Sequence, residues 1–235
     1  MNLQSRFWVL IFFFISGATG LIYEVVWTRL LTRVMGNTHY SIATVLTIFM
    51  AGLALGSYLG GRWIDRRKNS LIFYAALEGA IGLYCLLVPS MIESASPLFE
   101  WVYQTQTESY SKASLYRFFI CGVILLIPTS LMGATLPVLS KYVSHNRMFV
   151  GRDVGTLYSL NTFGAVFGAL SSAFIFMRVW GVLATIWFAA ALNIGIAVTI
   201  YLLFRSDVSA TSKEEPDQIN ESMKSSSLGT NTIFI

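Results

Sequence analysis

Charged residues are scarce in this sequence of 235 residues. They make up 12% of the chain, whereas hydrophobic residues make up 55%. A soluble domain of ordinary composition carries roughly 25% charged residues, so we exclude a water-soluble protein. Cysteine is equally rare, because only Cys85 and Cys121 occur and both lie in apolar runs. The sequence therefore predicts neither a disulfide framework nor a cysteine metal site.

Motifs for catalysis and cofactor binding are also missing. The two histidines, His39 and His145, lie apart, and no glycine-rich phosphate loop or nucleophile with an adjacent base occurs. We therefore expect no metal and no cofactor. The net charge of +4 does not call for a nucleic-acid partner, since basic residues in a membrane protein mostly set its topology.

Long apolar runs fill most of the chain. A membrane-spanning helix needs about 20 predominantly apolar residues. Six such segments can be drawn, at Phe7–Thr28, Ser41–Trp63, Ser70–Met91, Leu115–Ser140, Val154–Met177 and Val182–Phe204. The first resembles a secretory signal, but its apolar run continues to Leu31, which favours a retained helix. The sequence predicts an all-α, polytopic membrane protein with residues 1–205 as its transmembrane domain.

The distribution of Lys and Arg predicts the orientation. Five of them, beginning with Arg29, fall on one side of the expected helices, and nine fall on the other. The nine are Arg6, Arg62, Arg66, Arg67, Lys68, Lys141, Arg147, Arg152 and Arg205. Because basic residues favour the cytoplasmic side, both termini are predicted to be cytoplasmic, in the inner membrane of a bacterium.

The last 30 residues differ from the rest. Residues 206–235 are rich in Ser, Glu and Lys, a composition that cannot bury enough surface to fold alone. We expect a disordered cytoplasmic tail, or a linker whose next element is missing.

Glu24 lies inside the first apolar segment, with no basic residue next to it. A charge at mid-depth in a bilayer costs about 2.5 kcal/mol or more, so such a carboxylate faces protein or water. Helical spacing places Gly17, Gly20, Glu24 and Trp27 on one stripe. The two glycines would let a neighbouring helix approach closely beside the acid.

Glycines at four-residue spacing follow in the second segment. Gly52, Gly56 and Gly60 would line one face, which predicts a close helix–helix contact, with a substrate-facing surface as the less favoured reading. Directly after them comes GRWIDRRK, in which Gly61, Asp65 and Arg66 fit the cytoplasmic loop motif of the major facilitator superfamily, although Trp63 and Lys68 depart from it. The alternative is an ordinary basic helix end.

Two more polar residues interrupt apolar segments. Glu78 and Asn161 lie roughly 12 and 10 Å from the cytoplasmic ends of their helices, at 1.5 Å per residue. Their similar depth predicts that they pair, beside the packing glycines Gly164 and Gly168. The pair can be either a functional site or structural hydrogen bonding.

Prolines interrupt the fourth segment. Pro128 and Pro137 flank Thr129, Ser130 and Thr135. A proline kinks a helix and frees a carbonyl, which nearby hydroxyls can satisfy. This pattern is typical both of a helix that lines a transporter cavity and of a plain packing kink.

Five stretches in this order resemble a known family. They are SGATGLIYEVVWTRLL, SIATVLTIFMAGLALGSYLGGRWIDR, LEGAIGLY, IPTSLMGATLP and GTLYSLNTFGAVFGAL. They are similar to the membrane-embedded N-terminal part of bacterial spermidine-synthase-like membrane proteins, also described as fused major-facilitator/spermidine synthases. The resemblance covers about residues 7–204 and implies a six-helix bundle like half of a major-facilitator transporter.

The resemblance also implies a soluble aminopropyltransferase-like domain with sites for decarboxylated S-adenosylmethionine and putrescine. The sequence after Phe204 contains no such domain, so we expect that this chain is not an enzyme. The leading hypothesis is a non-catalytic membrane module that anchors a synthase-like partner and passes a polyamine-type molecule to it. The alternatives are a half-size transporter, completed by a second six-helix half or a homodimer, and a purely structural membrane subunit. All three require a lipid bilayer.

Overall fold

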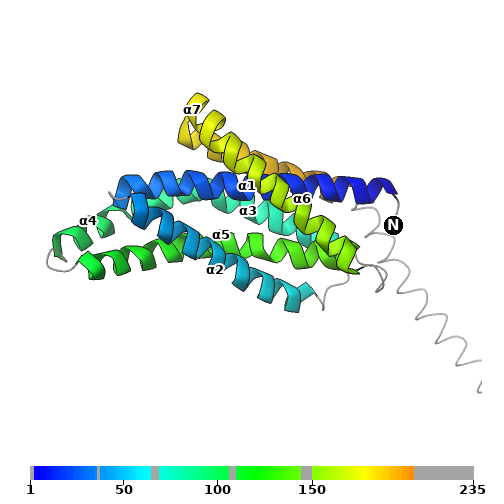
Figure 1. Cartoon of the computed structure of the whole chain (residues 1–235), viewed down its shortest axis with the longest axis horizontal. Coiled ribbons are helices and arrows are strands. Elements are labelled where there is room, and N and C mark those ends of the chain that lie inside the picture. Colours follow the sequence, from blue (N-terminus) through cyan, green and yellow to red (C-terminus); the bar gives the residue numbers. More distant parts are fainter. Residues whose placement is uncertain (1–2, 36–37, 65–68, 106–109, 144–149, 204–235) are drawn as a thin grey trace, which may run out of the picture.

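The computed structural model describes residues 3–35, 38–64, 69–105, 110–143 and 150–203 (Figure 1). The predicted all-α class is confirmed, since the described residues form helices joined by short turns and include no strand. Six of the helices are long and apolar enough to cross a membrane. Each predicted segment lies within one of them, apart from Phe204, which is outside the described residues.

The helices follow one another closely along the chain. In order they are α1 (Leu3–Met35), α2 (Thr38–Ile64), α3 (Ser70–Ser94), α4 (Ser96–Thr105), α5 (Tyr110–Val143), α6 (Val150–Ser171), the π-helical η1 (Ser172–Phe176) and α7 (Met177–Val179). A final helix spans Gly181–Leu203 and is drawn in orange in Figure 1. Gly181 turns the chain between α7 and the final helix with a φ of 81°, a conformation that L side chains rarely adopt.

Glycines bring α2 and α5 into backbone contact. A Cβ added to Gly56 would fall well within 3.0 Å of the Ser130 carbonyl oxygen, closer than real Cβ atoms come. In return, Gly133 of α5 lies against the backbone of Leu53. Gly52 and Gly60, one turn before and after Gly56, also lie directly against α5. Because the glycines leave room for the other backbone, the two helices form a tightly packed pair.

A second pair is formed by α1 and α6 in the same way. Gly164 packs on the backbone of Phe14, and Gly168 packs on that of Ala18. From the other side, Gly17 of α1 lies against the backbone and side chain of Asn161. Each of the two pairs is therefore held together by close glycine contacts between its two helices.

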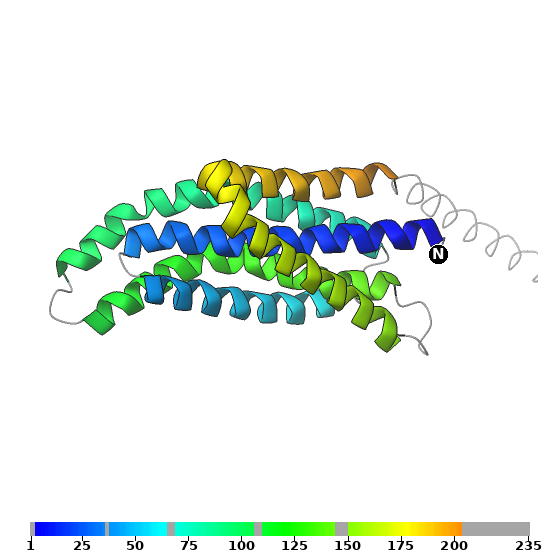
Figure 2. The ribbon, with the colours of Figure 1, turned by 45° about the horizontal axis from the view of Figure 1, so that its top comes forward.

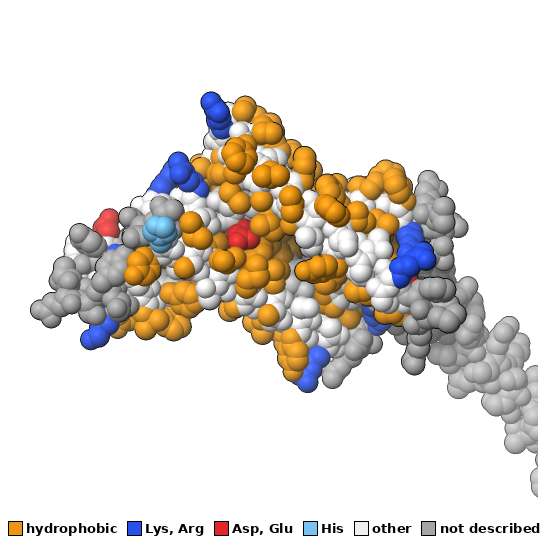
Figure 3. All heavy atoms as spheres, in the orientation of Figure 1, with side chains coloured by type: hydrophobic (Ala, Val, Ile, Leu, Met, Phe, Trp, Pro, Cys, Tyr) orange, Lys and Arg blue, Asp and Glu red, His pale blue; other side chains and the backbone are white. Residues whose placement is uncertain are grey.

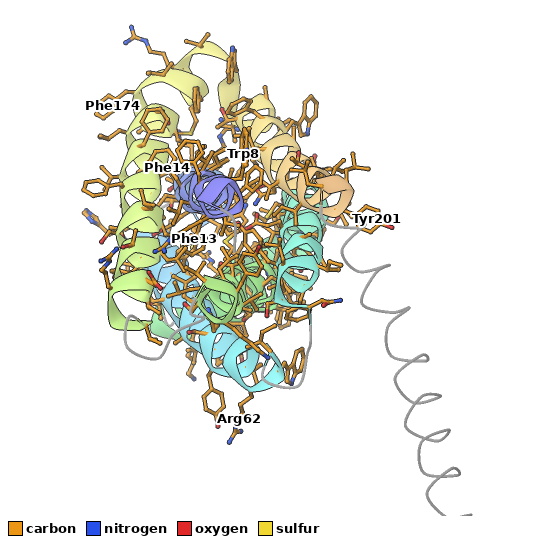
Figure 4. The ribbon with its side chains drawn as sticks, turned by 90° about the vertical axis from the view of Figure 1, so that its right-hand side faces the viewer. Trp8, Phe13, Phe14, Arg62, Phe174 and Tyr201 are labelled. Carbon is orange, nitrogen blue, oxygen red and sulfur yellow. The ribbon has the colours of Figure 1, made fainter. Side chains whose placement is uncertain are left out.

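The final helix lies beside α3 (Figure 2). A Cβ added to Gly82 would be 2.8 Å from Ile194 Cγ1, and one added to Gly79 would be 3.4 Å from Ala197 Cβ. When the bundle is viewed along its length, α1 lies in the middle, with Phe13 directed into the bundle and Phe174 and Tyr201 directed away from it (Figure 4). Phe13 is 1% exposed, whereas Phe174 is 72% exposed. The outward-facing apolar side chains suit contact with lipid.

Proline leaves one carbonyl of α5 without its partner inside the helix. Pro128 has no N–H, so the Ile124 carbonyl four residues earlier loses its usual donor. The hydroxyl of Tyr84 from α3 donates to this carbonyl at 3.1 Å. Thr129, which the sequence suggested for such a role, donates instead to Leu125 and Leu126. The hydrogen bond lost at Pro128 is thus replaced by one from α3, which packs against α5.

At both ends of the bundle, a basic side chain donates a hydrogen bond to the last carbonyl group of a neighbouring helix. Arg117 of α5 donates to the carbonyl of Met35, the last residue of α1, at 3.3 Å. At the opposite end, Lys141 donates to the carbonyl of Ile64, the last residue of α2, at 2.5 Å. A cation is favourable there because the last carbonyls of a helix are unsatisfied and carry partial negative charge. Figure 3 shows the matching surface, in which a largely hydrophobic band separates Lys and Arg side chains toward the two ends.

Candidate functional site

A cavity of about 330 Å³ lies between the two glycine-packed pairs. Its walls come from α1, α2, α5 and α6, and most of the lining side chains are apolar, among them Phe49, Leu53, Met132 and Leu136. The polar lining residues are Ser16, Ser57, Thr135, Tyr158 and Asn161, and none of the described residues that line the cavity is charged. Because Ser57 and Tyr158 on its rim are exposed, the cavity is open to the surface of the bundle.

Asn161 is held at this cavity by its helix contact. Its backbone carbonyl and its side-chain Oδ1 both lie against Gly17, where any larger residue would displace them. Asn161 itself is half-buried, and it follows Tyr158 by one helical turn on the same cavity wall. An amide at this position offers both a donor and an acceptor to a molecule in the cavity.

Glu78 lies behind the cavity in a fully buried network. Its side chain is 0% exposed. The Ser16 hydroxyl donates to Glu78 Oε1 at 2.6 Å, and Asn193 Nδ2 donates to Oε2 at 2.5 Å. The hydroxyl of Tyr23 donates to Asn193 Oδ1 at 3.0 Å. Tyr74, one turn before Glu78 on α3, lies beside the carboxylate and Ser16, although no contact of its hydroxyl with the described residues meets full hydrogen-bonding geometry.

The predicted pairing of Glu78 with Asn161 is wrong. The two residues are at similar depth, but α1 separates their helices, so Ser16 meets Glu78 while the adjacent Gly17 meets Asn161. Ser16 is the link between them, because it lines the cavity with one part of its surface and bonds to the buried carboxylate. The cavity and the carboxylate are thus neighbouring parts of one site.

Glu24 lies apart from this network. It is half-buried on α1, one turn after Gly20, which lines the cavity. Among the residues that the structure describes, none donates a hydrogen bond to its carboxylate. Trp27, on the same stripe, is fully buried and stacks on Tyr23 with ring centroids 5.5 Å apart. The structure therefore does not bring Glu24 together with Glu78 or Asn161.

The loop motif is only partly described. Gly61 lies at the end of α2 near Pro137, whereas Asp65 and Arg66 are outside the described residues. The assignment of residues 206–235 to a tail or linker also stays a prediction, since residues 204–235 are not described. Within the described parts of the chain, no group of three or more His, Cys, Asp or Glu side chains is placed to hold a metal.

Two residues of the site were not predicted from the sequence. Ser16 is a short side chain beside a glycine, a combination that usually indicates helix packing alone. Asn193 is the one amide in the last apolar run, and this was a usable signal, because buried amides in membranes need partners. Neither position could have been joined to Glu78 without knowing which helices are neighbours.

Comparison with known proteins identifies distant relatives. The chain is 24% identical over 204 residues to polyamine aminopropyltransferase 1 of Streptomyces coelicolor, which is 86% of this chain and 35% of that protein. It is 25% identical over 208 residues to polyamine aminopropyltransferase 2 of the same organism, with 87% and 35% covered. Polyamine aminopropyltransferase of Oceanobacillus iheyensis is 19% identical over 189 residues, with 80% and 34% covered. No protein family description and no solved structure matches the chain.

These relatives correct one expectation. The prediction that this chain is not an enzyme is wrong, because the proteins to which it is similar carry the name of an enzyme. The chain spans about a third of the length of those relatives. The sequence and the comparisons together establish a distant, spermidine-synthase-like relationship: the chain is similar to polyamine aminopropyltransferases over about a third of their length.

Proposed function

We propose that this chain is the membrane-embedded part of a protein related to polyamine aminopropyltransferases, and that its cavity holds a polyamine-type small molecule. The observation that supports this proposal is the cavity between the two glycine-packed helix pairs, whose volume of about 330 Å³ lies within the roughly 300–1,000 Å³ of small-molecule sites. The transferase part of the protein would receive the molecule from the cavity or deliver it there.

The chemistry of the cavity walls favours an aliphatic amine. Such a molecule has a flexible apolar chain and positively charged ends. Apolar side chains, including Leu53 and Met132, suit the chain, while the Asn161 amide oxygen and the Ser16 hydroxyl are acceptors for an ammonium group. Within the part of the chain that the structure describes, no Lys or Arg lines the cavity to repel a cation. The Glu78 carboxylate behind Ser16 adds an acidic group at 2.6 Å from that hydroxyl.

The orientation in the membrane is part of the proposal. Arg6, Arg62, Lys141 and Arg152 belong to the end with nine basic residues, which we place in the cytoplasm of a bacterial cell. The final helix ends on this side, so a soluble part that followed it would also be cytoplasmic. Ser16 and Asn161 lie in the half of the bundle nearer this end, and the cavity would therefore be within reach of a cytoplasmic transferase.

Binding of putrescine and spermidine to the purified chain tests the proposal. The chain would be reconstituted in lipid nanodiscs and titrated calorimetrically, with butane-1,4-diol as the uncharged analogue of putrescine. We expect saturable amine binding and none of the diol. Asn161→Leu should weaken binding about tenfold or more, because a hydrogen bond to a charged group is lost. Thr162→Val, on the exposed face of the same helix, is the matched control and should stay within about twofold.

Other outcomes would decide against the proposal. Equal binding of the diol and the amines would mean that the cavity does not recognise charge. Absence of amine binding in a folded wild-type chain would leave a structural membrane subunit. Uptake of labelled putrescine into liposomes that contain this chain alone would favour the half-size transporter.

A further inference from the structure

Glu78 has no charged partner among the residues that the structure describes. It is fully buried, and no Lys, Arg or His among the described residues forms an ion pair with it. Its hydrogen-bond donors, Ser16 and Asn193, are both neutral. An ionised carboxylate is costly in such surroundings, so its charge must be compensated either by a proton on the carboxyl group or by a cation nearby. The cavity that Ser16 lines is where a cation could lie.

The hydrogen bonds as arranged in the structure favour one oxygen of Glu78 as the position of a proton. Tyr23 donates to Asn193 Oδ1, which turns the amide so that its Nδ2 faces Glu78 Oε2. An amide nitrogen can donate but cannot accept, so Oε2 must remain an acceptor. A serine hydroxyl can do either. A proton on Glu78 therefore belongs on Oε1, between the carboxyl group and Ser16.

The protonation state of Glu78 decides how the Ser16 hydroxyl can bond to a molecule in the cavity. When Glu78 is ionised, the Ser16 hydroxyl donates to it, and the free lone pairs of Ser16 are left to accept from an ammonium group in the cavity. When Glu78 is protonated, its O–H donates to Ser16, and the serine hydrogen must turn elsewhere. The first arrangement favours a bound ammonium group and the second does not.

We propose that Glu78 and Ser16 form a proton-exchange site, from which one proton is released when a protonated amine enters the cavity. The proton leaves Glu78 Oε1 for water by way of Ser16, and the carboxylate that remains balances the charge of the amine. The inference rests on the proposed amine binding. Among the described residues, the titratable side chains that face Glu78 are Tyr23 from α1 and Tyr74 from α3. Both are phenols that ordinarily stay protonated at neutral pH, and Asn193 from the final helix does not titrate.

Tyr74 lies beside this site and offers it a further hydrogen-bonding group. Its hydroxyl is buried in contact with Glu78, but none of its contacts with described residues meets full hydrogen-bonding geometry. A carboxylate that has lost its proton can accept an additional hydrogen bond, so a small turn of the Tyr74 hydroxyl would satisfy both groups. The Tyr74 hydroxyl can therefore donate to Glu78 when the carboxylate is ionised and the amine is bound.

Calorimetry in two buffers tests the inference. Putrescine would be titrated into the full chain in nanodiscs at the same pH, in phosphate and in ACES, two buffers of neutral pH whose ionisation enthalpies differ, between about pH 6 and 8. The difference in heat counts the protons released for each amine bound. We expect about one proton for the wild type in the range where Glu78 is protonated, with affinity that rises up to tenfold for each pH unit there.

Glu78→Gln should release no proton, bind putrescine about tenfold or more weakly, and lose the pH dependence. Glu93→Gln makes the same chemical change at an exposed position of α3 and should behave as the wild type. If Glu78→Gln does not fold, Ser16→Ala keeps the carboxylate and removes the link, so its proton release should fall toward zero. Binding without proton release in the wild type, or release that persists in Glu78→Gln, would overturn the inference and leave amine binding intact. Absence of putrescine binding would overturn both proposals.

Discussion

The contact between α2 and α5 can be tested by adding one methyl group. In Gly56→Ala, the new Cβ would fall well within 3.0 Å of the Ser130 carbonyl oxygen, and real Cβ atoms essentially never come this close. The obstacle is backbone, which cannot rotate away as a side chain can. The helices would have to separate, and the contacts of Gly52 and Gly60 on either side would then loosen as well.

The expected loss of stability follows from this geometry. Overpacking of a well-packed interior costs about 1–3 kcal/mol, because neighbouring groups must shift. Alanine also has a higher helix propensity than glycine by up to about 1 kcal/mol, which works in the opposite direction. Because the overlap is with backbone, the upper end of the overpacking cost applies, and the net result should be destabilisation of about 2 kcal/mol. For a chain of this length, that lowers the midpoint of thermal unfolding by several degrees.

Gly122→Ala is the matched control for this experiment. Gly122 lies on α5, and a Cβ added there would meet nothing within 4 Å. Thermal unfolding of both variants in the same detergent, followed by intrinsic tryptophan fluorescence, should show a lower midpoint for Gly56→Ala and an unchanged or higher one for Gly122→Ala. If Gly56→Ala were as stable as Gly122→Ala, the close approach of α2 to α5 would be refuted.

Two further predictions concern the turn before the final helix and the orientation of the bundle. Gly181→Ala should destabilise the protein by about 1 kcal/mol, since its φ of 81° disfavours a side chain. Gly195→Ala, where a Cβ meets nothing within 4 Å, should not destabilise it in the same thermal assay. Single cysteines that replace Lys112 and Gly151, in a background without the native cysteines, should react with an impermeant maleimide from opposite sides of the membrane. We expect Lys112→Cys to react from outside, and labelling from the cytoplasm alone would invert the proposed orientation.

The helices could be predicted because their signals are local. An apolar run of about 20 residues specifies a membrane-spanning helix regardless of what surrounds it. The four-residue spacing of Gly52, Gly56 and Gly60 likewise marks one face of one helix. The short helix α4 gave a weaker signal, because its 10 residues are too few for a membrane-spanning apolar run. Prediction was reliable where a single segment contained all the information.

The partners of the polar groups could not be predicted, because they depend on which helices are neighbours. Depth alone suggested Asn161 as the partner of Glu78, but the actual donors are Ser16 and Asn193. The carbonyl freed by Pro128 is a similar case. Hydroxyls on the same helix were close in sequence, yet Tyr84 from α3 donates the hydrogen bond. In both cases, residues distant in sequence supply the contact.

The central position of α1 explains why one short stretch contributes to both parts of the site. Neighbouring residues of a helix point in directions about 100° apart, so Ser16 and Gly17 face different helices. Ser16 bonds to Glu78 of α3, whereas Gly17 admits Asn161 of α6, and both residues line the cavity. A larger residue at Gly17 would push α6 away and change the shape of the cavity, while loss of the Ser16 hydroxyl would leave the packing and remove the hydrogen bond to the carboxylate. The shape of the cavity and its link to the buried acid can therefore be altered one at a time, by substitutions at adjacent positions of α1.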